Sequence, residues 1–395
     1  MATSTWTTNL YNLAGTQLAS LTELSDRQFI DPLNGMDQMN LGMYLDDPSA
    51  TLIQPLTTVV KMWRNVNDPL NGKTWTQPAG QPTFCGIVGY VNKDGAGNKM
   101  TFQCYSPMWR LKFRFHLLNH RLVKNNLVAD VNYGNPWDQS ELMWKLIDLT
   151  NGAFGSASHT QIYKGNWVRP TIIVSPYYVA QGSNVWSNLV DDLLARVGGT
   201  DISPRYIHTA GTPNLMWFDT AYPRGTDRSA TVSLDYHTGL TNIDNMTELQ
   251  QMQPDQFGNY DWVVGQGDEN SNKIGVAFDA TGNPYSYGTI GVYMARSTAF
   301  EAKTSQAAAN IADEFIKLSR VPAKGYSVSL APMTPPYYKT DLNTGDLVRL
   351  NASRGGLTVS AAKQRIVQIA ITMSENNVES TDLLLTGDLK GRFAA

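Results

Sequence analysis

The sequence has few charged residues, only two cysteines and no long apolar run. Charged residues make up 16% of its 395 residues, compared with about 25% in typical soluble domains. The first residues, Met-Ala-Thr-Ser-Thr-Trp, contain no basic region followed by an apolar stretch, and no segment has the apolar length that a bilayer requires. We therefore expect neither a signal peptide nor a membrane span, and we expect synthesis and folding in the cytosol.

The charges that are present nearly balance, with 31 Lys and Arg against 34 Asp and Glu and a net charge of -3. Only residues 110–124 concentrate basic side chains, so the electrostatic footprint of general nucleic-acid binding is missing. Low charge with 10% aromatic residues is typical of an interface-rich protein, because interface cores are depleted of Lys, Glu and Asp. A large β-rich domain would have a similar composition.

The two cysteines, Cys85 and Cys104, lie in two predicted strands, residues 84–91 and 99–105. A turn centred on Asp94-Gly95 would place them opposite each other, whereas a longer loop through Asn98 would shift them out of register. Because the chain is expected to fold in the cytosol, we predict two buried free thiols. No third sulfur or nearby histidine completes a zinc site.

The N-terminal part predicts a small β-barrel, residues 1–124. Its short predicted strands are separated by strong turn formers, Asp31-Pro32-Leu33-Asn34-Gly35, Asp46-Asp47-Pro48 and Asn67-Asp68-Pro69. Short strands with regular turns are typical of a barrel or sandwich. The predicted strands are residues 6–13, 17–21, 38–45, 59–64, 84–91 and 99–105.

Residues 110–117 allow two interpretations. Apolar and basic residues alternate there, which favours a last barrel strand with a basic face. The competing interpretation is a helix that starts at Ser106-Pro107, because Leu111, Phe115 and Leu118 recur at helical spacing.

The middle of the chain, residues 125–230, predicts a mixed α/β insert. Asp138 with Glu141 resembles a capping box for a helix over 141–150 that Asn151-Gly152 would end. A second helix is expected over 183–197, and strands are expected over 171–174 and 206–208.

Residues 231–325 predict a β-rich segment that ends in a long helix. Strands are expected over 231–236, 261–264, 274–278 and 290–294. The helix, Ser305 to Val321, carries one apolar stripe and ends before Pro322; the stripe consists of Ala308, Ile311, Ala312, Phe315 and Leu318.

The C-terminal part, residues 326–395, predicts a second small barrel. Residues 337–350 turn at Thr344-Gly345-Asp346, and the glycine loop Arg354-Gly355-Gly356 leads into residues 365–373 and then 381–385. Within 365–373, apolar residues alternate between two faces, which is the period-two pattern of a strand. The predicted fold class is therefore α+β and β-rich, with N- and C-terminal β-barrels flanking a mixed insert.

This order of elements resembles phage tail-tip, or baseplate, hub proteins. The resemblance rests on Phe84-Cys85-Gly86-Ile87-Val88-Gly89-Tyr90, the strand Phe102 to Tyr105, the mixed insert, the long helix and Gly345-Asp346-Leu347-Val348. Similar hubs include the late-control D proteins of contractile-tailed phages and hub-like minor tail proteins of long-tailed actinobacterial phages. The chain departs from them in the large segment from about 125 to 300.

The resemblance implies a homotrimer in which each chain contributes two barrels to a six-barrel ring. Such a ring joins the sixfold tail tube and distal tail protein above to the threefold spike or fibre below, and lines the channel for DNA or the tape-measure protein. It implies a structural virion protein at the tail tip, assembled in the host cytoplasm, with no catalytic residues, cofactor or sequence-specific nucleic acid. The residues that form the assembly interfaces are not identified by the sequence.

Several side chains are of the types that catalyse reactions or bind metals, but structural roles explain them better. His116 and His120 would share a helix face, but the segment lacks the Glu of a metalloprotease motif and a third ligand. Asp341, Asn343 and Asp346 suggest a calcium loop, yet Ala352 stands where a bidentate Glu is needed. We expect structural or solvated histidines and an ordinary turn.

The remaining candidates are paired acids and tryptophans. Asp191-Asp192 and Asp313-Glu314 lie on predicted helices without a cleft signal, so solvated helix faces are expected instead of a glycosidase pair. Four tryptophans would stack on sugars if exposed, although core or interface packing is the expectation: Trp137, Trp167, Trp186 and Trp217. No serine-centred elbow, Walker loop or dinucleotide fingerprint is present.

We therefore predict a non-enzymatic structural hub of a phage tail tip. One alternative is the distal tail ring protein, a hexamer with a β-rich first domain. The alternative from another class is a carbohydrate-binding or carbohydrate-cleaving tail protein that contacts the host envelope through Trp and Tyr residues of the middle segment.

Overall fold

The structure of the protein is a computed structural model. It describes residues 2–115, 120–123, 126–127, 137–153, 161–166, 173–174, 177–179, 183–194, 200–209, 215–221, 223–239, 241–251, 258–265, 273–290, 292, 294–298, 304–319 and 323–386. The chain divides into two compact units. Unit 1 comprises residues 1–246, 328–384 and 391–395, and unit 2 comprises residues 247–327 and 385–390.

The N-terminal part of unit 1 is built from strands, as the turn signals predict. They are β1 (Thr3–Asn12), β2 (Gln17–Leu21), β3 (Leu24–Pro32), β4 (Gln38–Tyr44), β5 (Thr58–Asp68), β6 (Lys73–Trp75), β7 (Phe84–Asp94) and β8 (Lys99–Tyr105). A short 3₁₀ helix, η1 (Pro48–Leu52), begins where the Asp47 carboxylate accepts a hydrogen bond from the Ser49 amide at 2.7 Å. Strands β3 and β6 were not predicted from the sequence.

The β7–β8 hairpin determines the relative positions of Cys85 and Cys104. Asp94 pairs with Lys99, so the loop extends to Asn98, and Cys104 lies opposite Val88 instead of Cys85. Both thiols are buried and free, which confirms the prediction of two free cysteines.

The C-terminal part of the chain contains β22 (Ala323–Leu330), β23 (Leu347–Arg354), β24 (Leu357–Met373) and β25 (Glu379–Thr386). The hairpin from β23 to β24 turns at Gly355-Gly356, whose φ angles of 65° and 81° explain the two glycines. The predicted strand over 365–373 is the second half of β24, with Ile369, Ile371 and Met373 fully buried. Residues 337–346 are loop and turn, including the predicted turn at Thr344-Gly345-Asp346, and the strand begins at Leu347.

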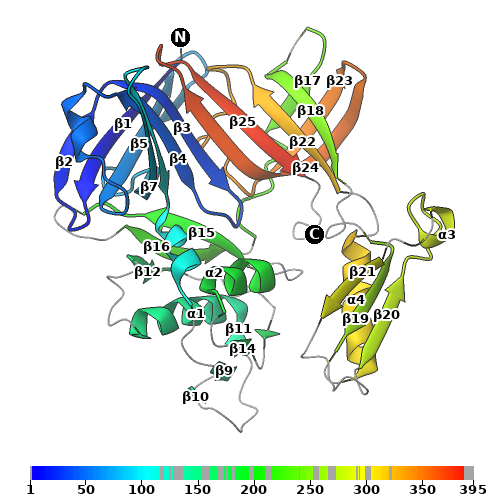
Figure 1. The fold of residues 1–395 in the computed structure, drawn as a ribbon. Coiled ribbons are helices and arrows are strands. Elements are labelled where there is room, and N and C mark those ends of the chain that lie inside the picture. Colours follow the sequence, from blue (N-terminus) through cyan, green and yellow to red (C-terminus); the bar gives the residue numbers. More distant parts are fainter. Residues whose placement is uncertain are drawn as a thin grey trace. The chain divides into compact units, whose positions relative to one another are not determined.

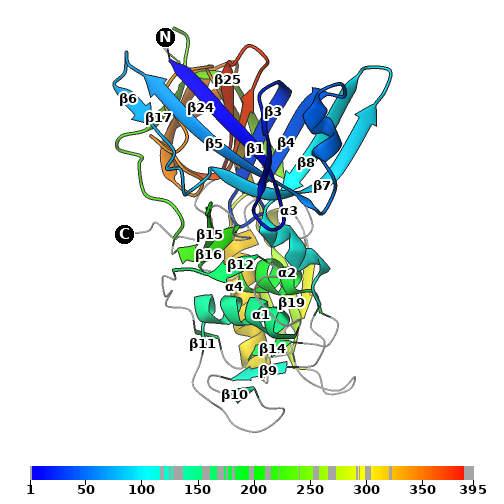
Figure 2. The ribbon, with the colours of Figure 1, turned by 90° about the vertical axis from the view of Figure 1, so that its left-hand side faces the viewer.

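Strand β24 pairs with strands from both the N-terminal and the C-terminal part of the chain. Its first half pairs with β23, and its second half pairs antiparallel with β3, from Gln368 opposite Pro32 to Met373 opposite Arg27. The result is a single 14-stranded sheet with the order β18-β22-β25-β24-β3-β4-β8-β7-β5-β1-β2, and with β17, β23 and β6 off this path. Figures 1 and 2 show that the sheet is curled, and that it contains both the blue N-terminal strands and the orange and red C-terminal strands.

The chain is therefore mostly β, with large antiparallel sheets, as predicted. The sheet path has two ends among the described strands and does not close into a barrel. The separate closed barrels of the sequence prediction are not observed there.

The strand predicted over 110–117 is wrong. Residues Pro107–Phe113 form a 3₁₀ helix, η2, which Ser106 precedes. Pro107 pre-sets the helical φ angle, and Met108 and Leu111, three residues apart, both turn into the core. Phe115 makes only an isolated bridge to Asn184.

The middle of unit 1 is mixed α and β. Helix α1 (Gln139–Ala153) confirms the first predicted helix, but continues through Asn151-Gly152, and buries Leu142, Met143, Leu146 and Ile147. The second predicted helix is a turn of α2 (Val185–Ser187) followed by the π-helix η4 (Asn188–Leu193). Small sheets surround them, made of β9 (His120–Val123), β10 (Asn126–Leu127), β11 (Trp137–Asp138), β12 (Ile162–Lys164), β13 (Ile173–Val174), β14 (Tyr177–Val179), β15 (Asp201–Tyr206) and β16 (Met216–Ala221).

Two of the predicted strands in this region are shifted or shortened. The strand expected over 206–208 is the end of β15, which stops at Tyr206. The strand expected over 231–236 is β17 (Ser233–Tyr236), which pairs in parallel with β23. Strand β18 (Ile243–Gln251) was not predicted.

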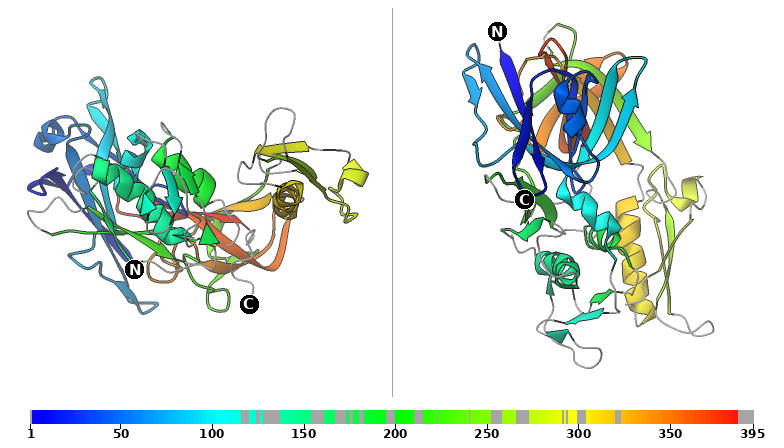
Figure 3. Two further views of the ribbon diagram at one scale, coloured as in Figure 1. Left: turned by 90° about the horizontal axis from the view of Figure 1, so that it is seen from below. Right: turned by 60° about the vertical axis from the view of Figure 1, so that its left-hand side comes forward.

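Unit 2 is a three-stranded sheet with one long helix. The sheet order is β20-β19-β21, from β19 (Tyr260–Val264), β20 (Ile274–Phe278) and β21 (Met294–Thr298), and helix α3 (Tyr287–Ile290) precedes β21. The strand predicted over 290–294 is therefore wrong. Helix α4 (Ser305–Ser319) confirms the predicted helix, and Ala308 and Ala312 pack on Val263. Figure 3 shows α4, in yellow, along one face of this sheet.

The four predicted domain boundaries stay a prediction. Among the described residues, no helix combines the length and apolar character needed to cross a membrane.

Candidate assembly surfaces

A network of buried charged groups in unit 1 links strands that are distant in sequence. Arg224 donates to Asp31 at 2.7 Å, and the Tyr338 hydroxyl donates to the same carboxylate at 2.8 Å. Beside them, the Tyr206 hydroxyl donates to Asp37. Apart from the Asp37 Oδ1 atom, which is buried and makes no hydrogen bond, these charged and phenolic groups pair with one another, so the network explains stability and specificity of the fold better than catalysis.

One carboxyl of this network has an unusual pKa. Burial, followed by the nearby charge of Asp31, raises the pKa of Asp37 to about 7. The adjoining cavity is small, about 300 Å³, and it lies against residues that hold β3, β15 and the segment around Tyr338 together.

A second buried network links the first and last strands of unit 1. Glu379 of β25 accepts hydrogen bonds from Arg64 of β5 at 2.8 Å, from the Ser4 hydroxyl at 2.6 Å and from the Trp6 indole at 3.1 Å. Burial alone would raise the pKa of Glu379, but hydrogen bonds and the positive charge of Arg64 hold it below its usual range.

The residues of the rejected calcium loop have structural partners. Asp346 accepts from the Arg228 guanidinium at 2.8 Å and from the Thr226 amide at 2.7 Å, and Asp341 accepts from Lys73 at 2.5 Å. Gly345 has a φ angle of 94°, which explains the glycine in the predicted turn. No group of three or more metal-ligating side chains occurs within the described ranges.

The residues of the histidine and acid pairs that the structure describes lie in three elements. His120 lies in strand β9 and not on a helix, while His116 is outside the described residues. Asp191 and Asp192 lie in η4, and Asp313 and Glu314 lie in α4.

The tryptophans proposed for sugar binding pack against neighbouring side chains where they are described. Trp186 is half-buried with the Lys112 ammonium 5.8 Å from its ring centre. Trp217 is half-buried between the Arg205 guanidinium at 5.7 Å and the Tyr163 ring at 5.9 Å. Trp137 belongs to β11, and Trp167 is outside the described residues.

One apolar exposed surface is the open face of the unit 2 sheet. Gly275 and Ala277 of β20 face α4, so the alternate residues Ile274, Val276 and Phe278 face away from it and are 43%, 42% and 51% exposed. Trp262 of β19 lies opposite Val276 in the sheet. We call these four residues the open sheet face. This exposed face could have been predicted from the sequence, because large residues alternate with Gly and Ala in Ile-Gly-Val-Ala-Phe.

A second surface lies beside η2 in unit 1. A groove of about 820 Å³ is lined by apolar residues, including Leu56 and Phe113, which are 58% and 63% exposed, and by the two cations Arg110 and Arg114. Burial, with a contribution from the Arg114 charge, lowers the pKa of Arg110 to about 10. Sequence reasoning found the basic residues of this surface but assigned them to a strand.

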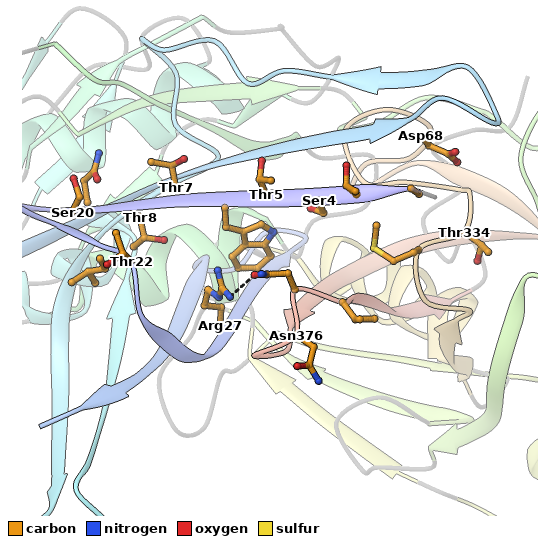
Figure 4. A pocket seen from close by; sticks show the side chains of 18 of the residues that line it. Ser4, Thr5, Thr7, Thr8, Ser20, Thr22, Arg27, Asp68, Thr334 and Asn376 are labelled. Carbon is orange, nitrogen blue, oxygen red and sulfur yellow. Dashed lines mark hydrogen bonds between the residues drawn. The ribbon is translucent and has the colours of Figure 1, made fainter. Parts of the chain in front are cut away.

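A third surface is the seam pocket, a cavity of about 980 Å³ at the free edge of β1. We define it by three walls: residues Ala2–Asn9, Arg27 of β3, and the turn from Asn376 to Val378. Figure 4 shows Ser4, Thr5 and Thr7 along one wall, with Arg27 and Asn376 across from them. Threonine, serine and asparagine dominate its lining.

The curled, mostly antiparallel sheet with its mixed insert has the fold of solved phage and prophage tail proteins. No protein-family model matches the sequence, and no curated protein is significantly similar to it. The likeness to these tail proteins comes from a comparison of structures.

Three solved structures illustrate this likeness over nearly the whole chain. A tail protein from Neisseria meningitidis matches with a TM-score of 0.56 at 11% identity, covering 97% of both chains. The 43 kDa tail protein of prophage MuSo2 from Shewanella oneidensis has a TM-score of 0.56 at 12% identity, covering 98% of this chain and 99% of its own. The prophage tail protein gp18 from Listeria monocytogenes has a TM-score of 0.52 at 12% identity, covering 97% and 95%.

Proposed function

We propose that the chain is the structural hub of a phage tail tip or baseplate. The observation that carries this proposal is the end-to-end likeness of its fold to tail proteins of similar length. Those neighbours are tail structural proteins and not enzymes, which supports a non-enzymatic role.

In this proposal the chain forms a homotrimer. The N-terminal and C-terminal strand groups, which β24 joins, act as the two barrel-like modules that each chain contributes to a ring of six. The ring meets the distal tail protein and the sixfold tube on one side and a threefold spike or fibre on the other, and its inner surface lines the channel for DNA and the tape-measure protein. The chain would assemble in the host cytoplasm and remain in the virion.

The exposed surfaces of both units support an assembly role. Monomeric proteins rarely expose clustered apolar side chains without a partner, and both the open sheet face and the groove beside η2 carry them. The low charge fraction of the chain, 16%, agrees with large contact areas between subunits.

Gold-labelled antibodies against this chain, applied to isolated phage tails, test the proposed location. The proposal predicts label at the tail tip only, with at most one cluster on each tail. Label along the tube, at the head-proximal end, or absent from particles that contain their full set of tail proteins would overturn it. An antibody against the tube protein serves as the control for access.

A further inference from the structure

The seam pocket lies along a strand edge that lacks a partner. Strand β1 pairs with β5 over its whole length, from Thr3 opposite Asn67 to Asn12 opposite Thr58, without a register shift. On its other side it pairs with β2 only from Thr8 to Tyr11. From Thr3 to Thr7, about 17 Å of strand, this edge has no paired strand in the described part of the chain.

The register shows which backbone groups face this open edge. In an antiparallel pair, alternate residues direct both their N–H and C=O toward the partner strand. The Arg64 amide of β5 donates to the Thr83 hydroxyl at 3.2 Å, so it points away from β1, and Arg64 lies opposite Trp6. The Asn12 amide donates to Thr16, on the β2 side. Both observations place the N–H and C=O groups of Ser4 and Trp6 on the open edge.

Two polar side-chain atoms on the pocket walls are also without a partner. The Thr8 hydroxyl and the Arg27 Nε atom are buried and make no hydrogen bond, and both residues line the pocket. Buried polar atoms without partners are costly, typically about 1–3 kcal/mol each. They show that the wall beside the open strand edge is polar, and the unpaired backbone groups of that edge are the part of the site that a ligand could use.

The walls define the chemistry of that ligand. Of the lining residues only Arg27 and Asp68 are charged, with opposite signs, and both are engaged: Arg27 donates to Asn377 at 2.9 Å, and Asp68 accepts from the Tyr337 hydroxyl at 2.8 Å. A charged ligand would find no free counter-charge. The exposed Leu70 and Val378 favour an apolar contact at the rim.

We propose that the seam pocket accepts an extended, uncharged peptide segment of another tail protein, which pairs with β1 as an added strand. Addition of a strand to an exposed sheet edge is a general mode of peptide recognition. The backbone of the segment would pair with the outward N–H and C=O groups of Ser4 and Trp6. Only the choice of a tail protein as the source rests on the proposed function.

The test screens a library of random ten-residue peptides on beads against the full-length purified chain. Hydrogen exchange at the Ser4 and Trp6 amides is then measured with and without each selected peptide. The proposal predicts that selected peptides are uncharged and slow exchange at these two amides. Selection of charged peptides, binding that leaves both amides unprotected, or no binding at all would overturn it.

A pair of variants at one position isolates the backbone contact. Ser4→Pro removes the outward N–H at an edge that tolerates proline, whereas Ser4→Ala removes the same hydroxyl and keeps the N–H. Ser4→Pro is expected to weaken binding of a selected peptide about tenfold, and Ser4→Ala about twofold or less. Equal binding by the two variants would contradict strand addition. If Ser4→Pro does not fold, the exchange data on the wild-type chain decide.

A synthetic peptide with the sequence of β1 itself, residues 3–9, distinguishes a second copy of this chain as the occupant. The proposal predicts that this peptide binds more weakly than the selected ones. Preferential binding of the β1 peptide would contradict a different tail protein as the source. These measurements use the purified chain, so they are independent of tail-tip labelling. The peptide-binding proposal can fail while labelling supports the hub, and labelling can contradict the hub while peptides still bind.

Discussion

The Nη2 atom of Arg365, in β24, lies 2.7 Å from the Oδ2 atom of Asp201, in β15. The Arg365 side chain is 6% exposed and the Asp201 side chain is fully buried. Asp201 also accepts from the Arg224 amide at 2.9 Å and from Asn34 at 2.6 Å. This one carboxylate therefore ties the mixed insert to the strand that joins the two ends of the chain.

Replacement of Arg365 by Met is expected to destabilise unit 1 by about 3 kcal/mol, because it leaves a buried carboxylate without its cation. Lys363→Met is the matched control on the same strand. Lys363 pairs with Asp227 at 2.9 Å, but the two side chains are 60% and 38% exposed, and exposed pairs contribute about 1 kcal/mol or less. Urea unfolding measures both. Similar losses for the two variants would show that the buried pair has no special role.

Asp37 should make the stability of unit 1 depend on pH. Its pKa is raised to about 7 in the folded chain, whereas an unfolded aspartate has a pKa of about 3.9. Between these values the folded state holds a proton that the unfolded state has released, so this group lowers the stability as pH rises through this window.

Asp37→Asn removes this titration and is expected to flatten the decline in stability between about pH 4 and pH 7. Asp244→Asn, at an exposed position of the same unit, is the control for the removal of an aspartate carboxylate. The measurement is the free energy of unfolding at several pH values. Parallel profiles for wild type and Asp37→Asn would show that Asp37 does not carry the raised pKa.

Cys85 and Cys104 should be unreactive in the native chain. Burial raises the pKa of Cys85 to about 12, and burial likewise raises the pKa of Cys104 well above its usual value. Since the thiolate is the reactive form, a thiol reagent at pH 8 is expected to label neither cysteine before unfolding and both afterwards. Rapid native labelling would contradict the buried hairpin, and no labelling after unfolding would indicate a disulfide.

The open sheet face and the helix-facing side of β20 should respond differently to substitution. Val276→Lys places a charge on the open sheet face, so it is expected to leave the melting temperature within about 2 °C and to reduce incorporation into tails at least about tenfold. Gly275→Ala, one residue away, would place a methyl group against the backbone of Ala308 and Ala309 and should destabilise unit 2.

The control for Gly275→Ala is Gly288→Ala, which adds a methyl group where nothing lies within 4 Å. Melting curves and quantitative immunoblots of purified tails measure the two effects. Normal incorporation of Val276→Lys would remove the open sheet face from the assembly surfaces.

Local patterns in the sequence predicted many of the longer strands and both long helices, because alternation and helical stripes depend only on nearby residues. The prediction was wrong at 107–113, because strand and helix spacings coincide there. The segment forms a 3₁₀ helix that buries Met108 and Leu111. The pairing of β24 with β3 joins residues 27–32 to 368–373. No local pattern contains such a long-range contact, and the seam pocket, which depends on the resulting sheet, was missed for the same reason.

The most direct test of the hub proposal is the mass of the purified chain in solution, measured by light scattering over a concentration series. The proposal predicts a species of three times the 43.7 kDa chain mass. A hexamer would point to a distal tail ring instead, and a monomer at every concentration would contradict a hub that trimerises on its own.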